Sequence, residues 1–101
     1  MSVDFLLRTA IRNRRIITFT LHDLPRLAEP HDYGIIKGVE KLFFYQVGGQ
    51  SKSGPPFGWR WAVVSEIATL EVLDQTFNGS RPAPSGRHVH WDVVYASVSA
   101  R

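Results

Sequence analysis

The stretch that decides the fold is Tyr45-Gln46-Val47-Gly48-Gly49, followed by an eight-residue loop rich in Gly, Ser and Pro and then by Gly58-Trp59-Arg60-Trp61. Apolar runs end on both sides of this loop. Aromatic and β-branched residues favour strands, whereas glycine and proline favour turns. The stretch therefore predicts two strands joined by a long loop. Two large aromatic side chains and an arginine leave the loop together, which indicates a recognition site on the surface near it.

Length and composition predict a single small domain over residues 1–101. The chain is 44% hydrophobic and 12% aromatic, which is enough for one hydrophobic core. No apolar stretch approaches the roughly 18 residues of a membrane-spanning helix, and the N-terminal residue order differs from that of a signal peptide. The absence of cysteine fits a reducing compartment and excludes disulfides, thiolate catalysis and cysteine-ligated zinc. We therefore expect a cytoplasmic protein with no membrane partner.

A first helix is predicted over residues 3–14, with Ser2 as its N-cap. Its apolar residues recur at helical spacing and form one stripe: Val3, Leu6, Leu7, Ala10 and Ile11. Arg8, Arg12 and Arg15 lie three and four positions apart and form a basic ridge beside this stripe. Two interpretations of the ridge stay open, a solvated helix face and a surface for phosphates or an acidic partner.

Short extended runs predict five strands after the helix. They are rich in β-branched and aromatic residues and are separated by turn-prone segments such as His22-Asp23-Leu24-Pro25 and Lys37-Gly38. The expected strands are residues 16–21, 26–36, 42–47, 59–64 and 69–73. Pro30 donates no backbone hydrogen bond, so it predicts an edge, a bulge or a bend in the second strand. The pattern is typical of a small antiparallel β-barrel at residues 16–77, after an N-terminal helix at residues 1–15.

The last part of the chain, residues 78–101, is predicted to be a linker and a C-terminal segment. The linker, residues 78–87, is rich in Pro, Gly and Ser. Alternation typical of a strand follows at Val89, Trp91, Val93 and Tyr95. Spacing typical of a helix face is shown by Trp91, Val94, Tyr95 and Val98. The β-branched residues favour the strand.

Five short pieces follow one another along the chain: Ile17-Thr18-Phe19, Arg26-x-x-Glu29-Pro30-His31, Tyr45-Gln46-x-Gly48-Gly49, Gly58-Trp59-Arg60 and Ile67-x-x-Leu70. Their order and spacing resemble the small WYL-related domains of bacteria, over roughly two thirds of the chain. The resemblance implies an Sm-like or SH3-like β-barrel, and it favours a C-terminal helix. WYL domains are regarded as ligand-sensing modules of transcription regulators, and some are linked to nucleic-acid ligands and phage defence. The resemblance therefore implies a ligand-sensing or binding module.

The chain departs from the family pattern in two places. The Trp-Tyr-Leu triplet is absent, because the corresponding strand reads Lys41-Leu42-Phe43-Phe44-Tyr45. Where related domains tend to have an aromatic, an arginine, a hydrophobe and an acid, this chain has Ala62-Val63-Val64-Ser65, so that Val63 replaces a polar or basic ligand contact. A helix-turn-helix does not fit in the remaining length, so we expect a stand-alone module.

Arg26, Glu29 and His31 lie on one extended run. The two-residue period of a strand places Glu29 and His31 on one face and Arg26 on the other, unless a bulge near Pro30 changes the phase. As ligand contacts, Arg26 would bind a phosphate or carboxylate, His31 would donate or accept near neutral pH, and Glu29 would orient either of them. The structural alternative is a buried ion pair or a polar network that ties the bulge to a neighbouring strand.

The same period places Trp59 and Trp61 on one face of their strand and Arg60 on the other. We expect the tryptophans to face the core and Arg60 to face outward beside Tyr45 or Gln46. An exposed aromatic ring with an arginine stacks a nucleic-acid base and binds its phosphate. The predicted ligand-binding residues are accordingly Arg26, Glu29, His31, Tyr45, Gln46, Trp59 and Arg60.

Other chemistry has weaker support in the sequence. The loop at residues 48–58 fits an anion-binding nest or an ordinary hairpin loop, and it lacks the pattern of a P-loop. His88, His90 and Asp92 have a spacing that a metal site could use, but no other ligand set accompanies them, so we predict no metal and no cofactor. Neither a nucleophile elbow nor a carboxylate pair suited to acid–base work is present, and we expect no enzyme.

We therefore expect a non-catalytic module that binds nucleic acid, a nucleotide or another anionic ligand, with which the net charge of +3 is compatible. The alternative is a structural or protein-interaction module that forms a homodimer through an exposed strand edge or through the C-terminal segment.

Overall fold

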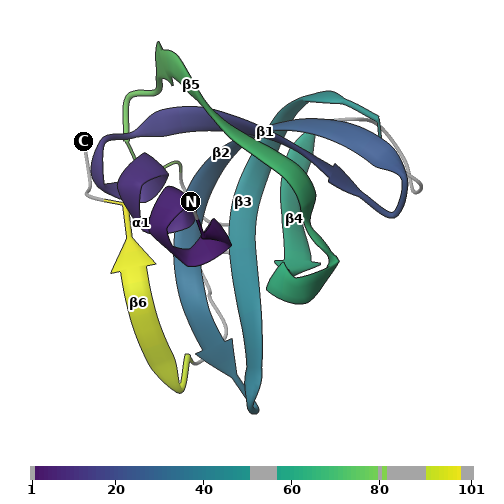
Figure 1. Ribbon diagram of the computed structural model, residues 1–101. Coiled ribbons are helices and arrows are strands. Elements are labelled where there is room, and N and C mark those ends of the chain that lie inside the picture. The colour runs from purple at the N-terminus through teal and green to yellow at the C-terminus, as the bar shows by residue number, and fades with distance from the viewer. Residues whose placement is uncertain (1, 51–56, 80, 82–90, 99–101) are drawn as a thin grey trace.

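One helix precedes an antiparallel sheet in a computed structural model that describes residues 2–50, 57–79, 81 and 91–98 (Figure 1). In chain order the elements are α1 (Val3–Arg12), β1 (Arg15–Leu21), β2 (Leu24–Ile36), β3 (Val39–Gly49), β4 (Gly58–Val63), the 3-10 turn η1 (Val64–Glu66), β5 (Ala68–Thr76) and β6 (Val93–Ser97). The prediction of a mainly antiparallel-β fold with an N-terminal helix is confirmed.

The long strand β2 organises the sheet. The strand order is β4-β3-β2-β1-β5, and β6 pairs with β2 outside this path. One edge of β2 pairs with β3, while the other pairs first with β1, at residues 24–28, and then with β6, at residues 32–35. The β2–β3 register shifts between Pro30 and Asp32, so that His31 is the additional residue of a bulge. The bulge predicted from Pro30 is therefore present, and it lies where β1 leaves β2 and β6 takes its place.

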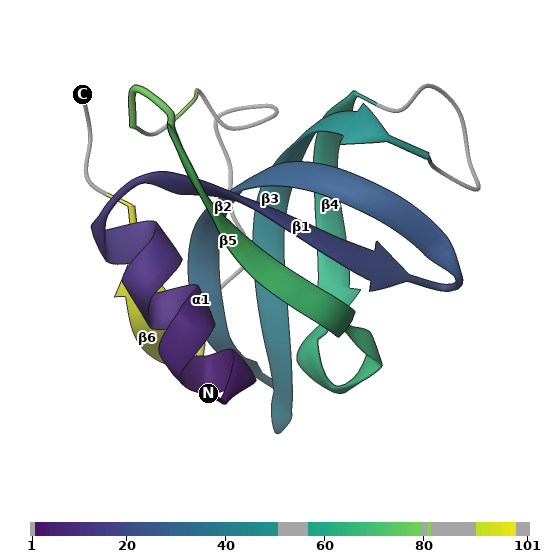
Figure 2. The same ribbon diagram turned by 45° about the horizontal axis from the view of Figure 1, so that its top comes forward.

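Strands β4 and β5 lie at the two ends of the path, and η1 joins them in the chain. Figure 2 shows β5 crossing in front of the sheet. The strand pairs of the described residues do not include one between β4 and β5, so the sheet is not closed into a barrel by backbone pairing. The closed barrel stays a prediction.

Helix α1 begins at its predicted cap and ends slightly earlier than predicted. The Ser2 hydroxyl accepts a hydrogen bond of 3.0 Å from the N–H of Phe5. The helix ends at Arg12, because Asn13 is the C-cap and Arg14 has a left-handed φ of 54°, which turns the chain into β1. Leu7, Ala10 and Ile11 are buried against the sheet. Among the described residues, no helix has the length and apolar character that crossing a membrane requires.

The predicted basic ridge does not form on α1. Arg15 belongs to β1, where its Nη1 lies 3.3 Å from Asp74. Arg8 donates to Asp4 at 3.0 Å and lies over the ring of Tyr95, 4.7 Å from the ring centroid. The helix ends before Arg15, so the three side chains do not share one helix face.

The C-terminal segment is a strand, which corrects the prediction of a C-terminal helix. Residues 93–97 pair with residues 32–35 of β2, and the register shifts so that Tyr95 is an additional residue. This shift breaks the two-residue alternation and leaves apolar residues at a spacing that mimics a helix. The free edge of β2 and the β-branched Val93 and Val94 favour the strand instead.

Two tight turns were predicted correctly. His22 and Asp23, between β1 and β2, have φ angles of 52° and 65°, and Lys37 and Gly38, between β2 and β3, have angles of 51° and 78°. Positive φ at both central residues is the geometry that two-residue hairpins favour. The buried core lies between α1 and the facing side of the sheet, and it includes Leu7, Ile11, Ile17, Phe19, Leu42, Phe44 and Ala62.

Candidate functional site

The predicted ligand-binding residues divide between the two faces of the sheet. On β3 and β4, Phe44 and Ala62 belong to the core, so alternation places their neighbours Gln46 and Arg60 on the same inner face. Arg26 joins them, since it donates to Gln46. The other four, Glu29, His31, Tyr45 and Trp59, lie on the outer face. The expectation that the tryptophans face the core and Arg60 faces outward is therefore wrong.

Arg26 is the central residue of the inner group. Its side chain is 5% exposed. Its Nη1 donates to Oε1 of Gln46 at 3.2 Å, and its Nη2 donates to the carbonyl oxygen of Leu21 at 3.3 Å. Its Nε is buried and has no hydrogen-bond partner within the described residues. Two of the three nitrogens of this guanidinium are thus held by neutral acceptors, while the third is unsatisfied.

Gln46 is fully buried and holds Arg26 in place. Its Nε2 donates to the carbonyl oxygens of Gly48 and Gln50, each at 2.9 Å. These bonds leave its Oε1 free to accept from Arg26, and they determine the orientation of the amide. The backbone around Gly49 brings the carbonyl oxygens of Gly48 and Gln50 to Gln46. Gly49 has a φ of 87°, and the N–H of Gln50 donates to Pro25 O at 2.8 Å.

The inner group, which consists of Arg26, Gln46 and Arg60, is positively charged, and no carboxylate binds Arg26. All nine Asp and Glu residues of the chain lie within the described part, and none is hydrogen-bonded or ion-paired to Arg26, whose bonds go to Gln46 and Leu21. Burial lowers the pKa of Arg26 from its ordinary value, and the charge of the half-buried Arg60 lowers it further. Two guanidinium groups are therefore close enough to repel each other on the inner face.

The outer group is built around an ion pair that the sequence did not predict. Arg81 binds Glu29 with both ends of its fork, at 2.6 Å from Nε to Oε1 and 3.1 Å from Nη2 to Oε2. The Arg81 guanidinium also lies 4.1 Å from the centroid of the Tyr45 ring. The hydrogen bonds to Glu29 raise the pKa of Arg81. The Glu29 carboxylate therefore orients Arg81, whereas the expectation was that it orients Arg26 or His31.

His31 is a neutral imidazole in one tautomer. Its Nε2 accepts a hydrogen bond of 3.1 Å from the N–H of Arg81, so its Nδ1 carries the proton and donates to Glu29 O at 2.9 Å. The side chain is 2% exposed, and burial lowers the pKa of His31. Together with the Glu29–Arg81 pair, these bonds form the polar network at the bulge that was predicted as the structural alternative.

Aromatic rings cover the outer face beside this network. Trp59 stacks on Phe43 at 4.6 Å between centroids, and Phe43 lies 4.4 Å from Trp61. His31 contacts the rings of Trp59 and Phe77 at 4.7 Å and 5.6 Å. Trp61 is 38% exposed, so this outer aromatic cluster reaches solvent mainly at its β4 end.

Sequence reasoning missed Arg81 and Phe77. Arg81 lies among Pro, Gly and Ser residues that indicate only a linker, and nothing in its local pattern relates it to Glu29, 52 positions away in the chain. Phe77 follows the expected fifth strand, which in the structure extends to Thr76. A longer fifth strand would have placed Phe77 near the core, but no signal in the sequence identified Arg81.

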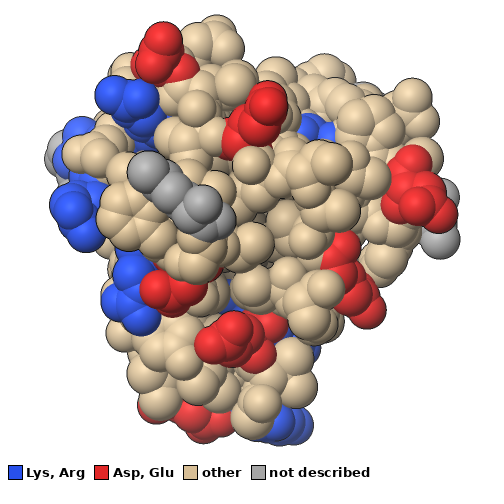
Figure 3. Space-filling model, in the orientation of Figure 1, with Lys and Arg blue, Asp and Glu red and all other residues tan. Residues whose placement is uncertain are grey.

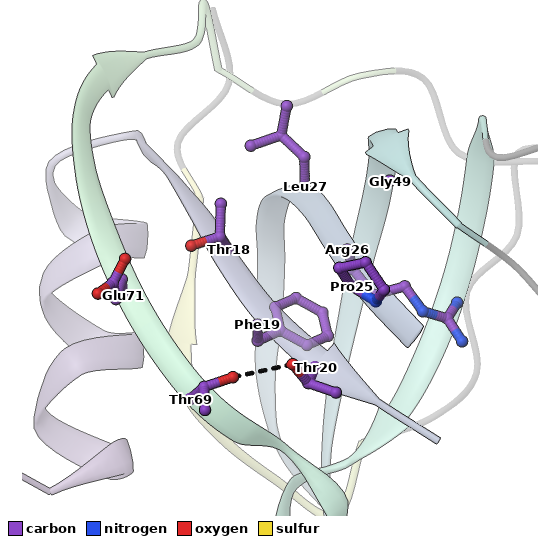
Figure 4. Close-up of a pocket in the computed structure, with 9 residues that line it drawn as sticks. All are labelled: Thr18, Phe19, Thr20, Pro25, Arg26, Leu27, Gly49, Thr69 and Glu71. Atoms are coloured by element: carbon purple, nitrogen blue, oxygen red, sulfur yellow. Dashed lines mark hydrogen bonds between the residues drawn. The ribbon is translucent and has the colours of Figure 1, made fainter. Parts of the chain in front are cut away.

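A hollow of about 390 Å³ lies on β1, β2 and β5, as Figure 4 shows. Hydroxyl groups line it, and Thr20 and Thr69 are hydrogen-bonded across it at 2.9 Å. Thr69 has a φ of 51°, which is unusual for a β-branched residue and coincides with a bulge in β5. Arg26 is one of the residues that line this hollow, and its guanidinium points away from Thr18 and Glu71 (Figure 4).

The metal-binding pattern gains no support from the described residues, which contain no group of three or more His, Cys, Asp or Glu side chains arranged to hold a metal ion. His88 and His90 lie outside the described residues. Asp92 accepts a hydrogen bond of 2.6 Å from the N–H of Lys37, which ties the start of β6 to the β2–β3 turn. The loop residues 51–56, part of the predicted anion nest, also lie outside the described residues.

Comparison of the chain with protein-family models, curated proteins and solved structures gives no match. The resemblance to WYL domains therefore stays a prediction based on the residues quoted above.

Proposed function

We propose that this chain is a small, non-catalytic module that binds an anionic ligand at the inner face of its sheet. The observation that carries the proposal is Arg26, a guanidinium that is 5% exposed, has no carboxylate partner and lies close to a second guanidinium. An arginine can be buried at low cost only when its charge is compensated and its donors are satisfied. An anion bound there supplies both the charge and the missing acceptor.

Each inner residue has a distinct role in this proposal. Gln46 holds the Arg26 fork through Oε1, and its own amide is fixed by backbone carbonyls. Arg60 supplies the second positive charge. Arginine suits this task because its planar fork matches the geometry of phosphate and carboxylate oxygens.

The outer residues contribute separately. Glu29 and His31 fix Arg81 against the bulge, and we assign them a structural role. Tyr45 and Trp59 lie at the outer aromatic cluster. A ligand bound at the inner face can stack a planar group there if the ligand extends past the edge of β4. The predicted contact surface thus becomes an anion site on one face and a stacking surface on the other.

The proposed fold class is an Sm-like or SH3-like barrel of the WYL type. Its support is the strand order β4-β3-β2-β1-β5, the sharp change of partner along β2 and the 3-10 turn between β4 and β5. The proposed cellular role follows the resemblance, namely ligand sensing in the cytoplasm, connected with transcription regulation or nucleic acid.

The test is titration of the protein with short RNA, single-stranded DNA and nucleotides at two salt concentrations. Phosphate contacts must weaken as salt rises. Arg60→Ala should reduce affinity about 10-fold or more, as expected for loss of a charged hydrogen-bonding partner. Arg12→Ala, on the exposed side of α1, is the matched control and should bind as the unaltered protein does. Binding that ignores both salt and Arg60 would reject the site.

A second candidate is assembly into a homodimer through β6. Within the described residues β6 pairs only with β2, so its other edge has no strand partner among them. Val93 and Val94 on this strand are 45% and 53% exposed. An open strand edge beside exposed apolar side chains is a site for pairing with another chain.

A further inference from the structure

A hollow of about 270 Å³ lies on the surface between α1 and β6. The helix and the strand each contribute three residues to its walls, namely Arg8, Ile11 and Arg12, and Tyr95, Ala96 and Ser97. None of them belongs to the inner group, so this α1–β6 hollow is independent of the proposed anion site. We propose that the α1–β6 hollow and the adjoining edge of β6 dock an extended segment of a partner protein that carries an acidic side chain.

The strand side of the α1–β6 hollow offers backbone groups to a partner. Among the described residues β6 pairs only with β2, so its other edge has no strand partner there. Tyr95 has no partner residue on β2, because the register shifts at this point, and its carbonyl oxygen lies 3.5 Å from Nη1 of Arg8. A hydrogen bond of this length is weak, so an N–H of an added strand can replace it. A segment that joins a sheet edge gains its affinity from such main-chain bonds.

The helix side of the α1–β6 hollow offers positive charge. Arg12 lies in the last turn of α1, is exposed, and forms no ion pair within the described part of the chain. Arg8 is different, because its Nε lies 3.0 Å from a carboxylate oxygen of Asp4, which compensates its charge. Arg12 is therefore the group that meets an acidic side chain of the partner, and its planar fork matches the geometry of a carboxylate.

The composition of β6 favours another protein over a second copy of this chain. The strand Val93–Ser97 has no acidic side chain, so a second copy that paired through it would bring no carboxylate to Arg12. It would also bring its own arginines to the same edge. Val93 and Val94 are 45% and 53% exposed. A segment in which apolar and acidic residues alternate can contact both the valines and Arg12, because successive side chains of a strand point to opposite faces.

The distribution of charge favours a peptide over a strand of nucleic acid. On the face drawn in Figure 3, basic side chains gather along the side of α1, whereas acidic side chains are spread over the centre and the opposite side. Proteins that follow a nucleic-acid backbone use a continuous positive groove. A nucleic-acid backbone also has no N–H groups that could pair with a sheet edge. A confined basic patch beside the edge of β6 therefore suits an acidic peptide.

The experiment titrates the whole protein into a short fluorescein-labelled peptide in which valine alternates with glutamate. One companion peptide has glutamine in place of glutamate, and a second is N-methylated at every residue, which removes its main-chain donors. In fluorescence anisotropy the glutamate peptide should bind about 3- to 10-fold more tightly than the glutamine peptide, the effect of one exposed ion pair. Added salt should reduce this preference. N-methylation should weaken binding about 10-fold or more, because several main-chain bonds are lost.

Two variants and one spectroscopic measurement locate the site. Arg12→Glu should abolish the preference for the glutamate peptide. Lys41→Glu makes a matched change of charge on β3 and should keep the preference. In nuclear magnetic resonance spectra of the unaltered protein, the glutamate peptide should shift the backbone amide signals of Arg12 and of residues 95–97 most strongly. Circular dichroism establishes that each variant is folded.

Each other outcome overturns a defined part of the proposal. No binding of the glutamate peptide at about 1 mM overturns it as a whole. Equal binding of the glutamate and glutamine peptides, or a preference that survives Arg12→Glu, overturns the role of Arg12. Signal shifts confined to residues away from the α1–β6 hollow overturn the location. A dimer that excludes the peptide assigns the edge to a second copy, and single-stranded DNA that shifts the same signals while the peptide does not assigns the hollow to nucleic acid. Both results overturn the acidic partner.

Discussion

His31 lies at the bulge of β2 as a buried, neutral imidazole, and this gives the stability of the protein a defined pH dependence. Burial lowers the pKa of His31 below the ordinary value of 6.5. The unfolded chain therefore takes up a proton at a higher pH than the folded chain does. The charges that face the ring are Glu29 and Asp32 from β2 and Arg81 from the segment after β5.

We predict that the free energy of unfolding falls as pH decreases from 6.5 to the lower pKa of the folded state, and that the imidazole contributes no pH dependence above this window. The slope is at most about 1.4 kcal/mol per pH unit for one proton. Urea unfolding at pH values within and above this range measures the slope. His31→Gln should remove this part of the slope, because glutamine does not titrate but can still accept from Arg81 N–H.

The control is His22→Gln, since His22 is an exposed residue that contacts Glu66 at 2.9 Å. It should leave the His31 contribution in place. An unchanged slope in His31→Gln would show that another group causes the acid sensitivity.

At the residue scale, the sequence predicted which side chains share a face of the sheet better than it predicted which of the two faces meets the core. Alternation placed Glu29 and His31 on one face and Arg26 on the other, and the structure shows this arrangement. Alternation does not say which face meets the core. The tryptophans of β4 were assigned inward because of their size, whereas the smaller Ala62 occupies the inner face, where Leu42 and Phe44 of β3 already fill the core.

At the element scale, α1 is tied to β2 by a hydrogen bond from the Tyr33 hydroxyl to Oδ1 of Asp4, at 2.7 Å. Tyr33 is 1% exposed, and burial together with this bond raises its pKa. We predict that Tyr33→Phe destabilises the protein by about 1–2 kcal/mol, because it removes a bond to a charged acceptor. Chemical denaturation measures the loss.

Tyr95→Phe is the matched control for Tyr33→Phe. The two rings contact each other at 4.9 Å, but the Tyr95 hydroxyl makes an exposed bond of 3.3 Å to Glu40. Loss of the Tyr95–Glu40 bond should lower the free energy of unfolding less than loss of the Tyr33–Asp4 bond does. An equal loss in the two variants would contradict the view that the Tyr33 bond holds the helix to the sheet.

The packing of β6 depends on Gly34. A Cβ at Gly34 would overlap the carbonyl oxygen of Val93 and would lie 3.0 Å from Cε3 of Trp91. We predict that Gly34→Ala displaces β6 and destabilises the protein by about 1–3 kcal/mol. Urea unfolding and faster amide hydrogen exchange in β6 would report it. In the control Gly48→Ala, the new Cβ would meet the flexible end of Leu27 at 3.3 Å, so its effect should be smaller.

The same strand shows why one element was predicted wrongly. Helix and strand patterns both fitted the C-terminal segment, and the decision depended on the resemblance. The register shift at Tyr95 gives a short strand the apolar spacing of a helix. The deciding factor is the unpaired edge of β2 beyond the bulge, and a local pattern does not reveal a partner about 60 residues earlier in the chain. The tight turns were predictable because their residues determine their own geometry.

At the scale of the whole molecule, the edge of β6 that has no strand partner among the described residues leads to a prediction about the oligomeric state. If the β6 edge forms a dimer, sedimentation velocity at several concentrations should show a shift from monomer to dimer as concentration rises. Val94→Lys places a charge on this strand and should abolish the shift without unfolding the chain.

The control for the dimer is Val39→Lys. Val39 is also an exposed valine, 39% accessible, but it lies at the start of β3. Dimerisation that persists in Val94→Lys and disappears in Val39→Lys would place the interface elsewhere. A monomer at every concentration would exclude the β6 dimer and leave the anion-binding module as the better account.

The partner change along β2 also has a consequence for how the protein is made on the ribosome. The first half of β2 can pair with β1 soon after both emerge, but the edge of its second half that does not face β3 must wait for β6, which follows the other described strands in the chain. Throughout that interval the backbone groups on the β6-facing edge of residues 32–35 are exposed to solvent and can pair with another chain. Nascent chains stalled before β6 should therefore be the species that chaperones capture and that aggregates recruit.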